Sequence, residues 1–401
     1  MINIIGLGYI GLPTALMFAA HGNKVVGTDY NKALVDTLNS GKLTFSEKGL
    51  PELFAKALDA GITFTTDYVV SDTYIVAVPT PHDDVNKKVK ADYVISAVKS
   101  VLEVCPDDAT IVIESTISPG TIDKYIRPVV NAQSKPVQLV HAPERIIPGN
   151  LLYELQHNSH TIGADCRETA EKVKSLYATF CEAEIVLTDI RTAEMTKVVE
   201  NTFRDINIAF ANELAKICRE DNMDVYEIIS IANRHPRVNI LQPGPGVGGH
   251  CISVDPWFLV GDYPQLTNLI RTAREVNDSM PGFTLGRTLE IMAANGISAS
   301  EVGIYGLTYK ENIDDTRESP TLKLAEIAAE KDIKGFKYYD PFVSSEIVPG
   351  QCYDLETFLN GTKLVVLMIG HQEIRDAAEK LENILVFDTR NIKEIKADYT
   401  L

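Results

Sequence analysis

The chain has no long apolar run and no excess of positive charge, and each absence excludes a class of protein. None of the 401 residues fall in an apolar run of the roughly 20 residues that a membrane-spanning helix needs. The formal net charge is -17, so attraction to nucleic acid or to an anionic membrane is not expected. Met1–Gly6 lead straight into an apolar strand, without the basic segment and cleavage site of a secretory signal. We therefore expect neither a membrane protein nor a nucleic-acid-binding protein.

Cysteine is scarce, and the 6 cysteines lie far apart. No two of them form a Cys-x-x-Cys pair, so a zinc site is not expected, and we predict no metal. Scattered single cysteines favour a reducing compartment, which predicts a cytoplasmic protein. Cys251 has neighbours that set it apart. We predict that the others are small buried apolar residues: Cys105, Cys166, Cys181, Cys218 and Cys352.

Short apolar strands alternate with helical segments over the first part of the chain. The length exceeds what one hydrophobic core usually organises, so two or three domains are expected. The predicted strands are Ile2–Ile5, Lys24–Asp29, Tyr74–Val78, Thr110–Ile113 and Val137–Val140. Strands that alternate with helices indicate an α/β domain with a mostly parallel, doubly wound sheet.

A glycine-rich turn lies between the first strand and a helix that runs to Ala20. The turn reads Gly6-Leu7-Gly8-Tyr9-Ile10-Gly11, and the second strand ends in Asp29. The first glycine permits the tight turn, the second lets backbone reach a pyrophosphate, and the third lets helix and strand pack closely. A carboxylate at Asp29 would bind ribose hydroxyls and repel a 2′-phosphate, which predicts NAD rather than NADP. The alternative is the same strand, turn and helix without a ligand.

The pattern changes after Leu187. From Arg191 to about Asn222 apolar residues recur at helical spacing with no Gly or Pro, which predicts a long helix that links two domains. A second α/β unit begins near Val302, with strands at Lys337–Pro341, Leu364–Met368 and Ile384–Asp388. We predict two Rossmann-like doubly wound domains joined by a long central helix. The expected domain boundaries are 1–187, 188–290 and 291–401.

Two further loops follow predicted strands of the first domain. They contain Thr80, in Val78–Pro81, and Thr116, in Glu114–Gly120. Ligands of doubly wound sheets bind at the carboxyl ends of the strands, where small hydroxyl side chains can face cofactor and substrate. The alternative is that both segments are ordinary turns.

The loop Gly244–Pro256 combines glycines with a cysteine, Cys251, and a carboxylate four residues later, Asp255. Glycines let backbone approach a ligand closely, and a thiol at the exit of such a loop points to thiol chemistry. The neighbouring His250 could activate the thiol, contact ligand or pack against protein. A nucleotide cofactor together with a reactive thiol favours oxidation through a covalent thioester.

Two pairs of polar residues are candidate helpers of the thiol. Lys197 and Asn201 share a face of the long helix, where an ammonium and an amide could stabilise an oxyanion. The alternative is a solvated helix face. Glu144 follows a strand and could act as a general base, or it could be a surface carboxylate paired with Arg145.

Several motifs together resemble the UDP-glucose and UDP-N-acetylmannosamine dehydrogenase family over essentially the whole chain. In the order of the family they are the N-terminal glycine turn, Ala142–Arg145, Lys197–Thr202, Gly244–Pro256 and Asp314–Pro320. The loop with His250 before the cysteine and Val254 before Asp255 resembles the N-acetylmannosamine branch. The glucose branch usually has Ser and Lys at those two places.

The resemblance implies an NAD-dependent oxidation of a sugar C6 alcohol to the acid, with two NAD consumed. Cys251 would capture the intermediate aldehyde, and water would release the acid from a thioester. Lys197 and Asn201 would hold the C6 oxygen, and Glu144 would serve as base or orient water, helped by Thr116 and Asp255. The implied fold ends in a domain that binds UDP.

The resemblance also assigns contacts. Cofactor contacts are expected at Gly6, Gly8, Tyr9, Ile10, Gly11, Asp29, Thr80, Thr116 and Arg317. Substrate contacts are expected at Glu144, Arg145, Lys197, Asn201, Arg237, Gly246, His250 and Lys310. A homodimer is implied, because relatives reach the neighbouring site with an arginine that matches Arg237.

One position departs from the glucose branch, which has a second carboxylate four residues after the glutamate. This chain has Pro148 there, so water activation is expected to rest more on Glu144 or to use another group. The epimer of the sugar stays open among UDP-N-acetylmannosamine, UDP-N-acetylglucosamine and UDP-N-acetylgalactosamine, with UDP-glucose as a further alternative. Remoter alternatives are a two-electron hydroxyacid-type dehydrogenase and a non-catalytic nucleotide sensor.

Overall fold

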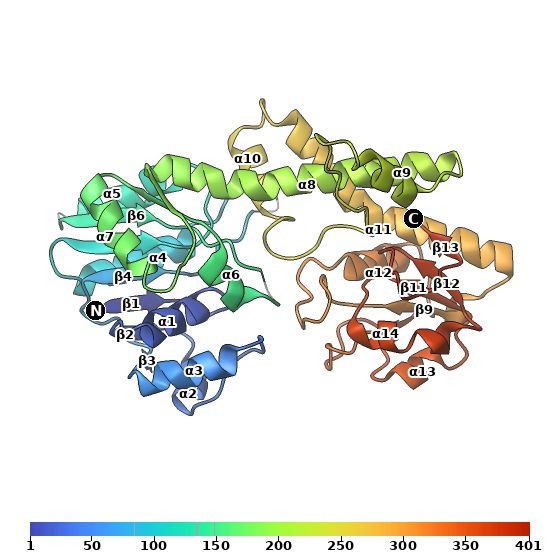
Figure 1. Ribbon diagram of the computed structural model, residues 1–401, viewed down its shortest axis with the longest axis horizontal. Coiled ribbons are helices and arrows are strands. Elements are labelled where there is room, and N and C mark those ends of the chain that lie inside the picture. Colours follow the sequence, from blue (N-terminus) through green and yellow to red (C-terminus); the bar gives the residue numbers. More distant parts are fainter. Residues whose placement is uncertain (84, 134, 148) are drawn as a thin grey trace. The chain divides into compact units, whose positions relative to one another are not determined.

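The chain divides into two compact units, which are described separately. The structure is a computed structural model that describes residues 1–83, 85–133, 135–147 and 149–401. Unit 1 comprises residues 1–200 and 257–263, and unit 2 comprises residues 201–256 and 264–401. Helix α8 (Ile190–Glu220) runs from one unit into the other (Figure 1). The division at residues 187 and 290 expected from the sequence stays a prediction.

Unit 1 is built on one sheet with the strand order β3-β2-β1-β4-β5-β6-β7-β8. Its strands are β1 (Ile2–Ile5), β2 (Val25–Thr28), β3 (Thr63–Thr65), β4 (Thr73–Val76), β5 (Ala109–Ile113), β6 (Val137–His141), β7 (His160–Ala164) and β8 (Ile185–Thr188). Neighbours pair in parallel, except that β7 runs antiparallel to β6. The carboxyl ends of β1, β4 and β5 therefore meet at one edge, which is where the predicted ligand loops begin.

Helices cover both faces of this sheet. They are α1 (Gly11–Ala20), α2 (Lys32–Asn39), α3 (Leu50–Asp59), α4 (Asp92–Val104), the π-helix η1 (Ile122–Ile126), α5 (Arg127–Ala132), α6 (Leu151–His157) and α7 (Arg167–Tyr177), with α10 (Asp255–Asp262) added from later in the chain. Alternate strand residues belong to two separate apolar cores: Ile4 packs with α1 and α7, and Ile5 packs with α4 and η1. This two-sided burial explains why the central strands are mostly apolar.

Unit 2 contains a second, smaller parallel sheet with the order β10-β9-β11-β12-β13. Its strands are β9 (Val302–Tyr305), β10 (Lys337–Tyr339), β11 (Leu364–Leu367), β12 (Leu385–Asp388) and β13 (Tyr399–Thr400). Its helices, besides the second half of α8, are α9 (Val225–Ala232), α11 (Asn268–Asn295), η2 (Ala299–Glu301), α12 (Pro320–Glu330), α13 (Leu355–Leu359), α14 (Gln372–Asp376) and η3 (Ala378–Leu381). The predicted fold class, two Rossmann-like domains joined by a long helix, is confirmed.

Two of the five cysteines that were predicted to be buried are not fully buried. Cys105, Cys181 and Cys218 are buried as predicted, but Cys166 is exposed and Cys352 is half-buried. Cys166 directly precedes α7, where its Sγ lies 3.1 Å from the Thr169 hydroxyl. A helix start is polar and open to solvent, so the prediction of burial was wrong there.

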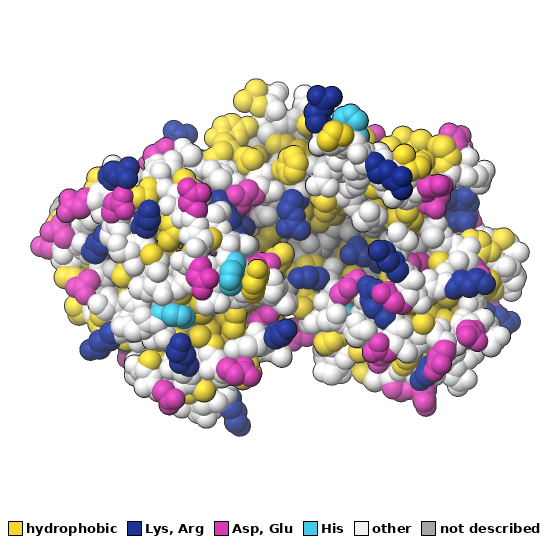
Figure 2. All heavy atoms as spheres, in the orientation of Figure 1, with side chains coloured by type: hydrophobic (Ala, Val, Ile, Leu, Met, Phe, Trp, Pro, Cys, Tyr) yellow, Lys and Arg dark blue, Asp and Glu magenta, His cyan; other side chains and the backbone are white. Residues whose placement is uncertain are grey.

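Charge is mixed on the face seen in Figure 2, where acidic and basic side chains are interspersed over each unit. Among the described residues, we find no helix that combines the length and the apolar character needed to cross a bilayer.

Candidate active site

The glycine turn of unit 1 forms an open cradle at the end of β1. Gly6 has φ +91°, a backbone conformation that favours glycine, and a Cβ on Gly11 would lie 1.9 Å from the Gly6 carbonyl oxygen. Side chains at these two positions would break the contact between strand and helix. A Cβ on Gly8, by contrast, would meet no atom within 4 Å. The space beside Gly8 is thus open at the start of α1, where free backbone N–H groups favour a pyrophosphate.

Asp29 fixes the far side of this cradle. Its Oδ2 accepts a hydrogen bond from the Leu7 backbone N at 2.8 Å, and its Oδ1 accepts from the Asn31 backbone N at 2.8 Å. Each carboxylate oxygen keeps further acceptor capacity for a ribose hydroxyl. Beside it, the rings of Tyr9 and Phe45 stack with centroids 4.3 Å apart. The turn and its carboxylate therefore fit NAD, and a 2′-phosphate here would meet negative charge.

Unit 2 contains a similar glycine turn, but there the protein itself makes further hydrogen bonds to the carboxylate. Gly306 has φ +96°, and the Leu307 backbone N donates to Oδ2 of Asp340 at 2.7 Å, as Leu7 does to Asp29. The same oxygen also lies 3.0 Å from Nε2 of the fully buried His371 and 3.1 Å from the Thr308 hydroxyl. The oxygen of Asp340 that corresponds to Oδ2 of Asp29 is thus saturated by protein. This difference assigns the dinucleotide to unit 1.

The loops after β4 and β5 are tied to each other. The Thr80 hydroxyl donates to the Thr116 carbonyl at 2.6 Å, and the Ser115 hydroxyl donates to the Val78 carbonyl at 2.7 Å. Thr80 is buried, and its hydroxyl hydrogen is already used. Thr116 is only half-buried. Both loops are therefore fixed beside the glycine turn, and their assignment to cofactor and substrate stays a prediction.

Glu144 is not a surface carboxylate, and the guanidinium of Arg145 forms its ion pair with another residue although its charge still acts on Glu144. Only 6% of it is exposed, and burial raises the pKa of its carboxyl to about 8 although the nearby Lys197 charge opposes this shift. Arg145 instead contacts Glu200 at 2.8 Å and donates to the Thr161 hydroxyl at 2.8 Å. A buried carboxyl with a pKa near neutrality suits a general base.

Lys197 and Asn201 do not form a solvated helix face. Each is 6% exposed, and they lie one turn apart on α8. Nδ2 of Asn201 donates to Oδ2 of Asp255 at 2.6 Å, so the amide is oriented by a residue of the cysteine loop. The structure thus brings together two of the predicted residues of unit 2, Asn201 and Asp255, and two of unit 1, Lys197 and Glu144.

The glycines before Cys251 make room for another part of the chain. A Cβ on Gly248 or Gly249 would lie within 2.7 Å of Tyr309, and the Gly249 backbone N donates to the Arg317 carbonyl at 3.0 Å. The cysteine loop therefore packs on the Asp314–Pro320 motif, and the hydrogen bond joins residues 68 positions apart in the sequence. Glycine is needed at these positions because the two backbones approach closely.

Cys251 itself is exposed at the end of this loop. Its carbonyl accepts a hydrogen bond from the Asp255 backbone N at 2.8 Å, which fixes the cysteine at the start of α10. The guanidinium of Arg317 binds Asp315 and also lies in electrostatic range of the Cys251 sulfur. Positive charge near a sulfur favours the reactive thiolate. The sequence alone suggested only His250 for that role.

The remaining predicted contacts lie in unit 2. Arg237 is exposed in the segment after α9, and His250 and Lys310 are half-buried. Gly246 has φ +137° and packs against Pro320. Their assignment to substrate stays a prediction. Pro148 lies outside the described residues.

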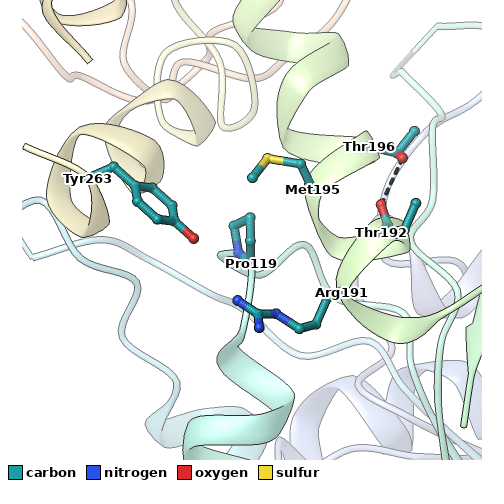
Figure 3. A pocket seen from close by; sticks show the side chains of 6 residues that line it. All are labelled: Pro119, Arg191, Thr192, Met195, Thr196 and Tyr263. Carbon is teal, nitrogen blue, oxygen red and sulfur yellow. Dashed lines mark hydrogen bonds between the residues drawn. The ribbon is translucent and has the colours of Figure 1, made fainter. Parts of the chain in front are cut away.

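A small open pocket of about 230 Å³ lies in unit 1 (Figure 3). Met195 and Tyr263 point toward Pro119, and the other lining residues are Arg191, Thr192 and Thr196. None of these six is among the predicted site residues, so this pocket is not the predicted reaction site.

Sequence reasoning missed three buried polar side chains near Glu144. Nε2 of His160 lies 3.2 Å from Oε1 of Glu144, and the Tyr177 hydroxyl donates to Oε1 of Glu114 at 2.8 Å. Burial and the charge of Glu144 raise the pKa of Glu114 well above its usual range. Glu114 directly follows β5 and could have been noted for that reason. His160 offers no local signal, since one histidine in an apolar strand is usually structural.

Sequence profiles of known families match all three parts of the chain. The NAD binding domain of the UDP-glucose/GDP-mannose dehydrogenase family matches residues 1–181, the central domain matches residues 191–279, and the UDP binding domain matches residues 303–394. The chain belongs to the UDP-glucose/GDP-mannose dehydrogenase family. The resemblance inferred from the sequence motifs is confirmed.

Relatives whose names state an activity are similar to this chain over nearly their whole length. A UDP-N-acetyl-D-mannosamine dehydrogenase of Methanococcus maripaludis is 43% identical over 98% of this chain and 92% of its own. An NDP-N-acetyl-D-galactosaminuronic acid dehydrogenase of Ralstonia nicotianae is 39% identical over 98% of this chain and 96% of its own. The solved UDP-N-acetyl-mannosamine dehydrogenase of Staphylococcus aureus is 39% identical, with a TM-score of 0.88 over 100% of this chain and 97% of its own.

The family fixes the class of reaction. This member of the family is an NAD-dependent UDP-sugar dehydrogenase. The cofactor expected from the glycine turn and Asp29, NAD, is confirmed by the family of its first domain. A UDP-sugar substrate agrees with the family of the last domain.

Proposed function

We propose that this enzyme oxidises the C6 alcohol of a UDP-N-acetylhexosamine to the carboxylic acid in two steps, through a thioester on Cys251. UDP-N-acetyl-D-mannosamine is the favoured substrate. The observation that carries the proposal is an exposed cysteine on a loop fixed by Asp255, Asn201 and the Arg317 carbonyl. A two-electron dehydrogenase has no use for such a thiol. The mannosamine relative at 43% identity supports the choice of sugar.

The chain's own residues supply the covalent and proton-transfer chemistry. Bound NAD would accept one hydride in each of the two oxidations. Cys251 attacks the aldehyde carbon as a thiolate, and the resulting thiohemiacetal oxygen needs donors, which Lys197 and Asn201 provide. After the second oxidation Glu144 takes a proton from water, the water oxygen bonds to the thioester carbon, and the thiolate of Cys251 leaves. Asp255 holds the Asn201 amide toward the reacting oxygen.

The choice of sugar is tested by comparing UDP-N-acetylmannosamine with its glucosamine and galactosamine epimers. We expect kcat/KM, followed as NADH formation, to be highest for the mannosamine. An inverted hydroxyl or acetamido group changes only a few contacts, so a preference of about 10- to 100-fold is expected. A higher kcat/KM for the galactosamine epimer would assign the chain with the Ralstonia relative instead.

The compartment and pathway belong to the same proposal. All 6 cysteines lie in the described part of the chain, and none of them forms a disulfide, as expected in a reducing cytoplasm. We place the enzyme in the biosynthesis of a surface polysaccharide, where acids of this kind are used in the family.

A homodimer is supported by an exposed apolar face on α8. Phe203 is 65% exposed, Phe210 49% and Ile217 50%, and their spacing of seven residues puts them on one side of the helix. Such a row on a soluble protein usually marks an interface. We propose that a second copy of the chain covers it, and that Arg237 then contacts the substrate of the neighbouring copy.

Introducing charge into this row is expected to separate the copies. Replacing both phenylalanines (Phe203→Glu with Phe210→Glu) should give a monomer by sedimentation and lower activity at least about tenfold, because burying unpaired carboxylates is costly. Tyr353→Glu is the matched control, since Tyr353 is an equally exposed aromatic residue in another part of unit 2. A dimer that persists in the double variant would contradict the assignment of this face.

A further inference from the structure

Glu144 lies in a buried cluster of titratable side chains that the reaction scheme above does not yet use. Oε1 of Glu144 faces Nε2 of His160 at 3.2 Å, and the side chains are 5% and 2% exposed. Oε2 of Glu144 is also buried and has no hydrogen-bond partner among the described residues. Oε1 of Glu144 thus contacts a ring nitrogen, whereas Oε2 has no hydrogen-bond partner among the described residues.

The hydrogen-bond roles follow from the protonation states. Burial, with the charge of Arg145, lowers the pKa of His160 to about 4 although a hydrogen bond to the Leu155 carbonyl opposes this shift, so the imidazole is neutral and one ring nitrogen carries its hydrogen. A carboxylate has no hydrogen to give. When Glu144 is ionised, the contact therefore requires that Nε2 of His160 donates to Oε1. The charge that remains available to a water molecule is then on Oε2.

We propose that His160 is a positioning residue for thioester hydrolysis, because its Nε2–H binds Oε1 of Glu144 and leaves Oε2 to accept the proton of water. The proposal rests on the proposed function, in which Glu144 is the base. It also answers the absence of the second carboxylate found in the glucose branch: here the glutamate is assisted by a histidine from β7. The atoms balance, since the proton moves from water to Oε2 while the Nε2–H bond stays intact.

Other groups around Glu144 set the background against which His160 acts. The positive ones are Lys197 from α8 and the adjacent Arg145. The groups that can become negatively charged are Glu154 from α6, Glu114 after β5, Tyr177 at the end of α7 and Cys181 after that helix. Lys197 and Arg145 already favour the ionised carboxylate. His160 differs from these two charges because it is neutral and contacts Oε1, and the backbone N–H of Arg145 is a further neutral donor to the carboxylate.

The test is the pH dependence of hydrolysis of the Cys251 thioester in the full-length enzyme. UDP-N-acetyl-D-mannosamine is mixed with excess NAD, samples are quenched, and mass spectrometry follows the decay of the adduct between pH 6 and pH 9. The variants are His160→Leu, which removes the donor, and His160→Gln, whose amide can reach the same oxygen. His160→Asn carries the same amide one methylene shorter and does not reach it. His157→Leu is the control, since His157 pairs with Glu182 on the surface.

We expect the midpoint of the pH profile to move upward by about one unit in His160→Leu and His160→Asn, because the ionised carboxylate loses a donor. Hydrolysis at pH 7 should fall about tenfold, while the first hydride transfer keeps its rate. His160→Gln should restore the wild-type midpoint, and His157→Leu should not move it.

Two results would overturn the proposal. One is an unchanged midpoint in both donor-less variants. The other is the same shift in His160→Gln as in His160→Asn, since any disturbance of packing would then explain it. A wild-type enzyme that forms no Cys251 adduct would overturn the proposed function itself, and this inference with it.

Discussion

Replacing Cys251 by Ala is expected to abolish formation of the acid. Without the thiol the aldehyde cannot become a thioester, so acid production should fall by more than about 1,000-fold, the scale seen when a covalent nucleophile is removed. Binding of NAD should survive, because the cradle around Gly8 and Asp29 lies in unit 1, whereas Cys251 belongs to unit 2. The measurement is acid formed per enzyme by chromatography, together with NAD affinity.

A second cysteine offers a matched control for this experiment. Cys166 is also exposed, and it precedes α7, which carries none of the predicted site residues. Cys166→Ala should therefore keep the wild-type rate. Acid formation at an undiminished rate in Cys251→Ala would show that the oxidation does not pass through a thioester on this residue.

Replacing Glu144 by Gln is expected to stop the reaction one step later. The glutamine amide cannot take a proton from water, so hydrolysis should slow by about 100- to 10,000-fold while the adduct on Cys251 accumulates. In the wild type the base is ionised only above its pKa of about 8, which burial raises. Hydrolysis should therefore gain about tenfold per pH unit below pH 8 and level off above it.

The neighbouring Glu114 provides the control for Glu144. It is also buried, and burial together with the charge of Glu144 raises the pKa of its carboxyl well above its usual range, which favours the protonated form. An amide resembles a protonated carboxyl and can still accept the Tyr177 hydrogen bond. Glu114→Gln should thus retain hydrolysis. Equal losses in both variants would mean that Glu144 acts through packing rather than as a base.

The parts of the fold that follow from local rules could be predicted from the sequence. The glycine turn and Asp29 have a fixed spacing because a strand, a tight turn and a helix start have fixed lengths. The long helix α8 could be predicted because its apolar residues recur at helical spacing. No such local rule predicts that β7 pairs with β6 in the antiparallel direction. The position of β7 depends on which apolar faces meet in the folded core. This strand was therefore not among those predicted from the sequence.

The same distinction applies to the site. Cys251 and Asp255 could be found because they share one loop, whereas the pairing of Arg145 with Glu200 joins residues 55 positions apart. Adjacency in sequence suggested an ion pair between Arg145 and Glu144, but the guanidinium of Arg145 binds Glu200 and the Thr161 hydroxyl. Burial likewise could not be inferred for Lys197, because its exposure depends on what α8 packs against.

The most direct test of the central claim is the yield of NADH when UDP-N-acetyl-D-mannosamine is limiting and NAD is in excess. The reaction is run to completion, and NADH and acid are counted against sugar consumed. Oxidation of an alcohol to an acid through a thioester on Cys251 requires two NADH and one acid per sugar. One NADH per sugar, with an aldehyde or ketone as the end product, would contradict the account and remove the role given to Cys251.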